Sequence, residues 1–68
     1  MMQTAHIKDW LLKFPNPDSN REGPYLTGYI TGHPQHEHDG FGMTTKVRFI
    51  DFERGFAITQ NTIYLLEV

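Results

Sequence analysis

The chain has 68 residues, of which 38% are hydrophobic, and its eight acidic and six basic side chains give a formal charge of −2. This length allows one small domain spanning residues 1–68. The weakly acidic balance argues against a protein that grips duplex nucleic acid through a basic surface, and the absence of cysteine excludes disulfide scaffolds, thiolate zinc sites and cysteine nucleophiles.

Membrane and export signals are missing from the sequence. No apolar run approaches the ~20 residues that a bilayer-spanning helix needs. The N-terminal segment also lacks the basic, apolar and small-residue pattern of a signal peptide. We therefore expect a cytoplasmic protein of bacterial or viral origin, the host cytoplasm if it is phage-encoded, with no membrane partner.

Residues 4–14 are predicted to form an amphipathic helix. Its apolar positions recur at the spacing of one helical face: Ile7, Trp10, Leu11 and Phe14. Pro15 ends the helix, because the residue before a proline is disfavoured in the α region. A helix of this length is marginal alone, so we expect Trp10 to anchor it on a sheet.

Residues 15–24 have the composition of a turn-rich linker, and residues 25–68 are predicted to form an antiparallel sheet. The first strand covers residues 25–31 and alternates, with Tyr25, Thr27, Tyr29 and Thr31 on one face. Gly28, on the opposite face, predicts a bulge or a close backbone approach.

Three further strands follow a long polar loop. The second strand is predicted over residues 43–52, where the apolar pattern changes face as in a curled or bulged strand. A tight turn at residues 53–55, with Gly55 in a left-handed conformation, leads to residues 56–60. A second tight turn leads to residues 63–68.

Short strands joined by tight turns pair antiparallel. The predicted fold class is therefore α+β or mostly β, with an N-terminal helix packed on a curled antiparallel four-stranded meander. A small SH3-like, partly open barrel and a two-layer sandwich both fit this element order. Gly28 and the change of face in the second strand favour the curled form.

The stretch Leu26–Pro34, Leu-Thr-Gly-Tyr-Ile-Thr-Gly-His-Pro, resembles a pattern in short uncharacterised proteins of bacterial phages and prophages. The pair Thr44-Thr45 and the stretch Thr59–Tyr64 continue the resemblance, which leaves out the predicted helix. Its motifs are strand and turn residues. The resemblance therefore implies an origin in a mobile element, and it implies no activity and no functional residues.

The densest group of potential metal ligands lies in the long polar loop: His33, His36, His38 and Asp39. Neutral imidazoles and carboxylates bind zinc, nickel or copper. In an extended segment His36 and His38 point to the same side, and His33 or Asp39 supplies a third ligand. The spacing matches no catalytic metal signature, and the simpler interpretation is a solvated polar loop. Weak metal binding is an alternative hypothesis, and no cofactor is expected.

A second candidate site combines aromatic and basic side chains: Tyr25, Tyr29, Lys46 and Arg48. If the faces of the two predicted strands coincide, two rings lie near two cations. Small barrels bind single-stranded nucleic acid through such a surface, by base stacking and phosphate contacts. The acidic balance argues against this function, and tyrosine is also simply a good strand former. Single-stranded nucleic-acid binding is therefore the second hypothesis.

Surplus aromatic residues point to a third kind of site. The chain carries one Trp, three Tyr and five Phe, whereas so small a domain buries only ~60% of its unfolded surface. Leftover aromatic side chains often form a partner surface. Phe41, which lies between two glycines, is the first candidate, together with Tyr25 and Tyr29. The alternative for Phe41 is a ring that folds back over the open end of the sheet.

The sequence shows no nucleophile elbow, phosphate-binding loop or dinucleotide fingerprint. We therefore predict no catalytic residue and do not expect an enzyme. The leading hypothesis is a small non-enzymatic protein–protein interaction module. Its expected partner is a host or phage protein, or a second copy of the chain in a homodimer.

Overall fold

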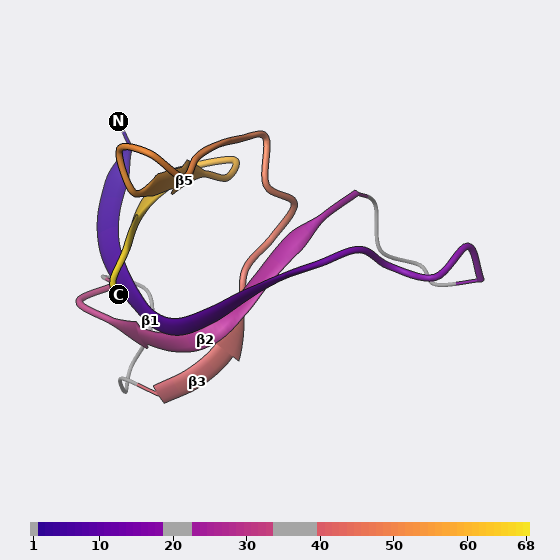
Figure 1. Ribbon diagram of the computed structural model, residues 1–68, viewed down its shortest axis with the longest axis horizontal. Helices are drawn as coiled ribbons and strands as arrows, with labels where there is room; N and C mark the ends of the chain where they lie inside the picture. The colour runs from indigo at the N-terminus through magenta and orange to yellow at the C-terminus, as the bar shows by residue number, and fades with distance from the viewer. Residues whose placement is uncertain (1, 19–22, 34–39) are drawn as a thin grey trace.

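The computed structural model describes residues 2–18, 23–33 and 40–68, and within these ranges the fold is all-β, with no helix. Six strands form one sheet: β1 (Gln3–Lys13), β2 (Tyr25–Thr31), β3 (Gly40–Met43), β4 (Phe49–Asp51), β5 (Phe56–Ile58) and β6 (Thr62–Leu66). Their order across the sheet is β3-β2-β1-β6-β5-β4 (Figure 1). Nothing in the described part of the chain is a helix able to cross a membrane.

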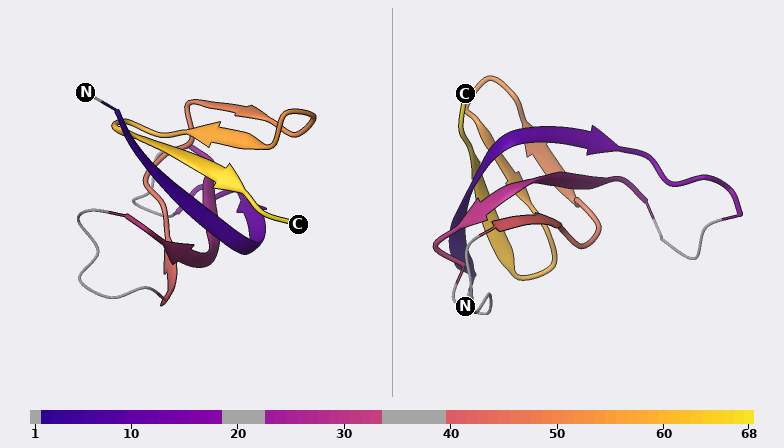
Figure 2. Two further views of the ribbon diagram at one scale, coloured as in Figure 1. Left: turned by 90° about the vertical axis from the view of Figure 1, so that its left-hand side faces the viewer. Right: turned by 90° about the horizontal axis from the view of Figure 1, so that it is seen from below.

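The sheet is open and mixed, so the predicted four-stranded antiparallel meander and the predicted barrel are both wrong. β1 pairs antiparallel with β2 and parallel with β6, whereas the remaining neighbours are antiparallel. The central strand β1 thus joins two halves, β2–β3 on one side and β6–β5–β4 on the other. β1 is strongly bent, and the two halves lie at an angle to each other (Figure 2).

A β-bulge interrupts β1 where it crosses β2. Between Lys8 and Leu11, two residues of β1 face the single residue Gly28. One of them, Asp9, has a left-handed φ of 53°, a conformation in which aspartate is enriched. A Cβ on Gly28 would lie 2.8 Å from the Lys8 carbonyl oxygen and 2.9 Å from Cγ1 of Ile7. Only glycine fits there, which confirms the close backbone approach predicted at Gly28.

The bulge also explains why the helix predicted over residues 4–14 is wrong. Ile7 and Trp10 both pack into the core, and the extra residue between them produces a three-residue step that imitates a helical face. The other two members of the predicted apolar face, Leu11 and Phe14, are exposed. Trp10 therefore anchors no helix, because it belongs to the central strand itself.

The run over residues 43–52, predicted as one strand, contains the end of β3 and the whole of β4. The change of apolar face in this run marks the passage from one strand to another. The connection crosses from one edge of the sheet to the other: the Thr44 N–H donates to the Leu26 carbonyl and the Arg48 N–H to the Ile58 carbonyl, each over 2.8 Å.

The two predicted tight turns at the C-terminal end are confirmed by the antiparallel pairs β4–β5 and β5–β6. Gly55 has a left-handed φ of 79°, as predicted. Its N–H donates to the Asp51 carbonyl over 2.8 Å, and its own carbonyl accepts from the Leu66 N–H over 2.8 Å. The turn therefore ties the β4–β5 hairpin to β6.

The core lies on the inner face of the bent sheet. Its buried members come from β1, from both halves and from the connection between β3 and β4: Ala5, Ile7, Leu26, Ile30, Val47, Ala57, Tyr64 and Leu66. Trp10 packs against this core, donates its indole N–H to the Glu67 carbonyl over 3.1 Å, and stacks on Phe52 at a centroid distance of 5.9 Å. Trp10 thus links the core to the segment after β6 and to the β4–β5 turn.

Candidate functional site

The outer face of β1, β2 and β3 carries exposed apolar side chains in adjacent rows. The register places Tyr29 opposite Phe41, and Thr27 opposite both Leu11 and Met43. The exposed fractions are 57% for Leu11, 49% for Tyr29, 65% for Phe41 and 55% for Met43. These four residues are called the outer apolar cluster below. Three neighbouring strands thus present one apolar surface to solvent.

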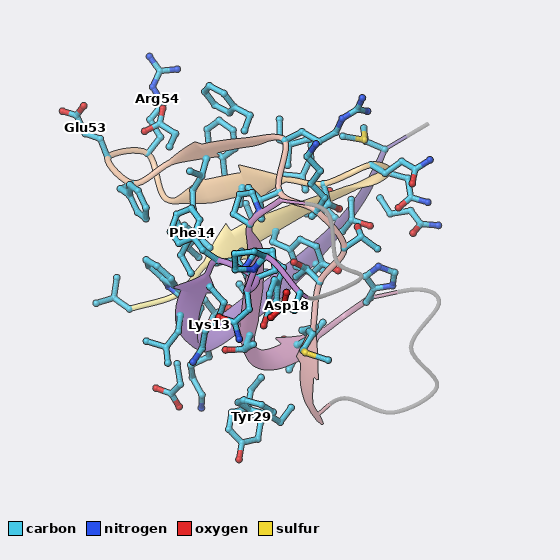
Figure 3. All side chains as sticks on the ribbon, turned by 90° about the vertical axis from the view of Figure 1, so that its right-hand side faces the viewer. Lys13, Phe14, Asp18, Tyr29, Glu53 and Arg54 are labelled. Carbon is cyan, nitrogen blue, oxygen red and sulfur yellow. The ribbon has the colours of Figure 1, made fainter. Side chains whose placement is uncertain are left out.

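An aromatic pair forms the centre of this cluster. The rings of Tyr29 and Phe41 meet edge to face, with centroids 5.5 Å apart and planes at 78°, an arrangement that aromatic pairs favour. Tyr29 projects away from the sheet (Figure 3). Both residues were predicted from the sequence as partner-binding, and the structure brings them together.

The strand β3 directs its large side chains to solvent and gives none to the core. Phe41 and Met43 lie on the outer face, and the alternate positions, which face inward, are Gly40 and Gly42. A Cβ on Gly40 would meet nothing within 4 Å, so crowding does not impose glycine there. Sheets with one solvated face usually show the opposite pattern, with apolar residues inward and polar residues outward.

The main chain of Phe41 points away from β2, on the outer side of the edge strand β3. Thr44 and Leu26 form a hydrogen-bonded pair, since the Thr44 N–H donates to the Leu26 carbonyl over 2.8 Å. Hydrogen-bonded and non-hydrogen-bonded pairs alternate along an antiparallel ladder. Gly42 is therefore the next residue bonded to β2, and the pair of Tyr29 with Phe41 is non-hydrogen-bonded. The N–H and C=O of Phe41 face away from β2.

Charged side chains border the cluster on the side of β1. A cavity of about 370 Å³ beside Tyr29 is lined also by Lys8, Asp9 and Glu67. The Glu67 Oε2 atom lies 2.7 Å from Nδ1 of His6. The cavity thus mixes one lysine with two carboxylates, and the part of the chain described by the structure holds no group of three potential metal ligands. An apolar centre with a charged border is typical of a protein–protein interface.

The remaining residues of the predicted nucleic-acid surface lie apart from Tyr29. Tyr25 is half-buried at the other end of β2, opposite Lys13. Lys46 and Arg48 lie in the connection between β3 and β4, outside any strand. Lys46 runs along Gly23, where a Cβ would be 2.8 Å from its Cε, whereas Arg48 is bonded to β5. Lys46 therefore lies beside the segment before β2, whereas the main chain of Arg48 is bonded to β5.

Among the predicted metal ligands, His33 is described by the structure, whereas His36, His38 and Asp39 lie outside the described residues. The His33 Nε2 atom lies 3.1 Å from the Thr62 hydroxyl, and its ring packs 6.0 Å from that of Tyr64. Burial raises the pKa of the Tyr64 phenol, and a hydrogen bond with Thr62 partly opposes this rise. His33 thus connects the end of β2 to β6.

No family model, curated protein or solved structure matches the chain. The outer apolar cluster is therefore argued from its geometry. Sequence reasoning missed two of its members, Leu11 and Met43. The signal that would have found Met43 is the stretch Gly40–Met43, in which glycine alternates with a large apolar residue and so predicts a strand with all its side chains on one face.

Proposed function

We propose that the chain is a small non-enzymatic protein–protein interaction module that binds its partner, a host or phage protein or a second copy of the chain, through the outer apolar cluster. The observation that carries the proposal is the exposure of four large apolar side chains in adjacent rows of three strands. Small monomeric proteins rarely leave contiguous apolar surface uncovered unless it binds something. The inward glycines of β3 support the same interpretation, because this strand gives its apolar side chains to a surface and none to the core.

The chemistry of the cluster favours a protein over a nucleic acid. Leu11 and Met43 flank the aromatic pair, and they suit the side chains of a partner protein better than they suit phosphates. Lys8 is opposite Tyr29 in the register, but it shares its cavity with Asp9 and Glu67. These two carboxylates repel a phosphate backbone.

A photo-crosslinking experiment tests this function. A benzophenone amino acid replaces Phe41 in one variant, and in the control it replaces Phe14, which is 72% exposed but lies beyond the end of β1. Both variants are illuminated in cells that produce the protein. We expect a discrete protein adduct from position 41 and none from position 14. No adduct at position 41, or equal labelling at both positions, contradicts the proposal.

A further inference from the structure

We infer that a second copy of the chain covers the outer face of β4, β5 and β6, and that the two sheets pack face to face about a two-fold axis that runs along the strands between β5 and β6. The inference goes beyond the proposed function, because it concerns the other half of the sheet and a different surface. It follows from an apolar face that carries opposite charges at its two ends.

The strands β5 and β6 carry apolar side chains on both faces of the sheet. Ala57, Tyr64 and Leu66 are buried in the core, and the residues that alternate with them point to the other side. With one residue of β4 these form an outer face that is called the second apolar cluster below: Phe49, Phe56, Ile58, Ile63 and Leu65. Strands that are apolar on both sides are typical of sheets with both faces covered.

Solvent reaches the second apolar cluster in the single chain. Phe49 is 53% exposed and Leu65 is 36% exposed, and the other three members are partly exposed. In Figure 1, β5 and β3 lie on opposite sides of the molecule, with the core on the inner face between them. The second apolar cluster and the outer apolar cluster therefore face different directions, and both can be covered at the same time.

The strand register arranges this outer face in two rows that are complementary to themselves. From β4 to β1 they contain Phe49, Ile58, Ile63 and Thr4 in one row, and Asp51, Phe56, Leu65 and His6 in the next. The proposed axis reverses the order of the strands and keeps the level of each row. Phe56 of one copy then lies over Leu65 of the other, and the symmetry makes the contact twice. Sheets that pack in this way keep their strand directions within about 30° of each other.

Charges of opposite sign lie at the two ends of this face. At the end formed by β4, Arg54 projects from the turn between β4 and β5 (Figure 3), and its Nε atom lies 3.9 Å from Oδ2 of Asp51. At the other end Glu67 follows β6 and contacts His6. The turn is hydrogen-bonded to the end of β6, which places Arg54 and Glu67 at a similar level along the strands. The axis therefore brings Arg54 of one copy to Glu67 of the other, and Asp51 to His6.

This charge arrangement selects a second copy as the occupant. Complementary charges at the border of an interface fix its orientation and disfavour other partners, and here the complement of each end is the opposite end of the same chain. The chain is also small: a core of this size rarely supplies more than ~3–5 kcal/mol, and oligomerisation is one way in which small domains bury more apolar surface. An apolar centre inside a charged border results.

Sedimentation velocity on the full chain, from micromolar to millimolar concentration, tests the inference. We expect a dimer whose dissociation constant is raised at least about tenfold by Leu65→Glu and by Phe49→Glu, because each puts a carboxylate into a buried apolar row. Phe14→Glu is the matched control for Phe49→Glu, since Phe14 is exposed beyond the end of β1. Thermal unfolding shows which variants are folded. A chain without a dimer, or a dimer that the control weakens as much as Phe49→Glu does, overturns the inference.

A charge exchange tests the proposed axis. Arg54→Glu alone and Glu67→Arg alone each place like charges together twice, and each should weaken the dimer by up to about fivefold per pair. The chain that carries both substitutions restores opposite charges across the axis, so we expect a tighter dimer than with either substitution alone. Both side chains are exposed, so this test does not depend on changes in the apolar rows. A double variant that dimerises no more tightly than the single variants overturns the axis.

The crosslinking result separates this inference from the proposed function, because position 41 lies outside the second apolar cluster. A chain that stays monomeric at millimolar concentration, while position 41 gives a discrete adduct, overturns the inference and leaves the proposed function supported. A dimer that Leu65→Glu dissociates, without any adduct at position 41, supports the inference and contradicts the proposed function. A dimer that Leu11→Glu weakens and Leu65→Glu does not places the second copy on the outer apolar cluster and overturns the inference.

Discussion

The two edge strands of the sheet differ in how they are held. β4 is anchored by side chains: Ile50 packs against the core, and Phe49 packs on Phe56 at a centroid distance of 5.8 Å. β3 turns Gly40 and Gly42 inward and contributes no side chain to the core. It is therefore held by its backbone pairing with β2 and by the residues that follow it.

The ends of the two edge strands show the same contrast. After β3, the buried Thr44 hydroxyl accepts the Leu26 N–H over 2.9 Å. At the end of β4, the Asp51 carboxylate accepts the Arg54 N–H over 2.9 Å at an exposed position. β3 thus differs from β4 in giving no side chain to the core, although its Phe41 ring packs edge to face on Tyr29.

The largest loss of stability is expected from a substitution in β1, because this strand pairs with both halves of the sheet. Ile7 is fully buried in β1, which joins the halves. Ile7→Ala should lower the free energy of unfolding by about 2–5 kcal/mol, against a total of only ~3–5 kcal/mol for so small a core. In urea denaturation followed by Trp10 fluorescence, both edges should be lost in one transition. A variant that keeps near-natural stability contradicts the role of β1 as the shared support.

A smaller effect should be confined to the β3 side. In Gly28→Ala the new methyl group meets the Lys8 carbonyl oxygen at 2.8 Å, and crowding of this kind costs about 1–3 kcal/mol. Hydrogen exchange should show faster exchange in β2 and β3 than in β5, relative to the natural chain. Equal changes in both halves would show that the bulge supports the whole sheet.

The local parts of the fold were predictable from the sequence, and the non-local parts were not. Alternation identified β2, and turn chemistry placed Gly55 correctly, because both signals lie within a few residues. The bulge at Asp9 broke the alternation of β1 and produced a false helical spacing. The parallel pairing of β1 with β6 joins the two ends of the chain, and no local sequence pattern indicates a pairing between segments so far apart.

Only part of the candidate site was predicted from the sequence. Phe41 was predicted because it lies between two glycines, and Tyr29 because it lies on the polar face of an alternating strand. Leu11 was assigned to the buried face of a helix, and the bulge instead places it on the outer face of β1. The contact between Tyr29 and Phe41 depends on the β2–β3 register, which the sequence does not reveal across the polar loop.

A matched pair of variants compares the ends of the two edge strands. Thr44→Val leaves the Leu26 N–H without its buried acceptor, which should cost about 1–3 kcal/mol. Asp51→Ala removes an exposed acceptor whose donor turns to water, so the loss should be about 0.5–1.5 kcal/mol. Chemical denaturation of both variants under the same conditions gives the comparison. A larger loss for Asp51→Ala would show that β4 is the edge that depends on its terminal hydrogen bond.

The smallest expected effect is on the pH dependence of the free energy of unfolding. It concerns Tyr64 of β6, against which His33 packs. Burial raises the pKa of this phenol above its ordinary value of 10.0. Above pH 10.0 the unfolded chain therefore loses a proton that the folded chain still holds, so the free energy of unfolding is unaffected below this pH and falls as pH rises through the folded pKa. Tyr64→Phe should remove this part of the slope. Urea denaturation on both sides of pH 10.0 measures it for the two chains, and parallel slopes would show that the phenol is equally hydrated in the folded and unfolded states.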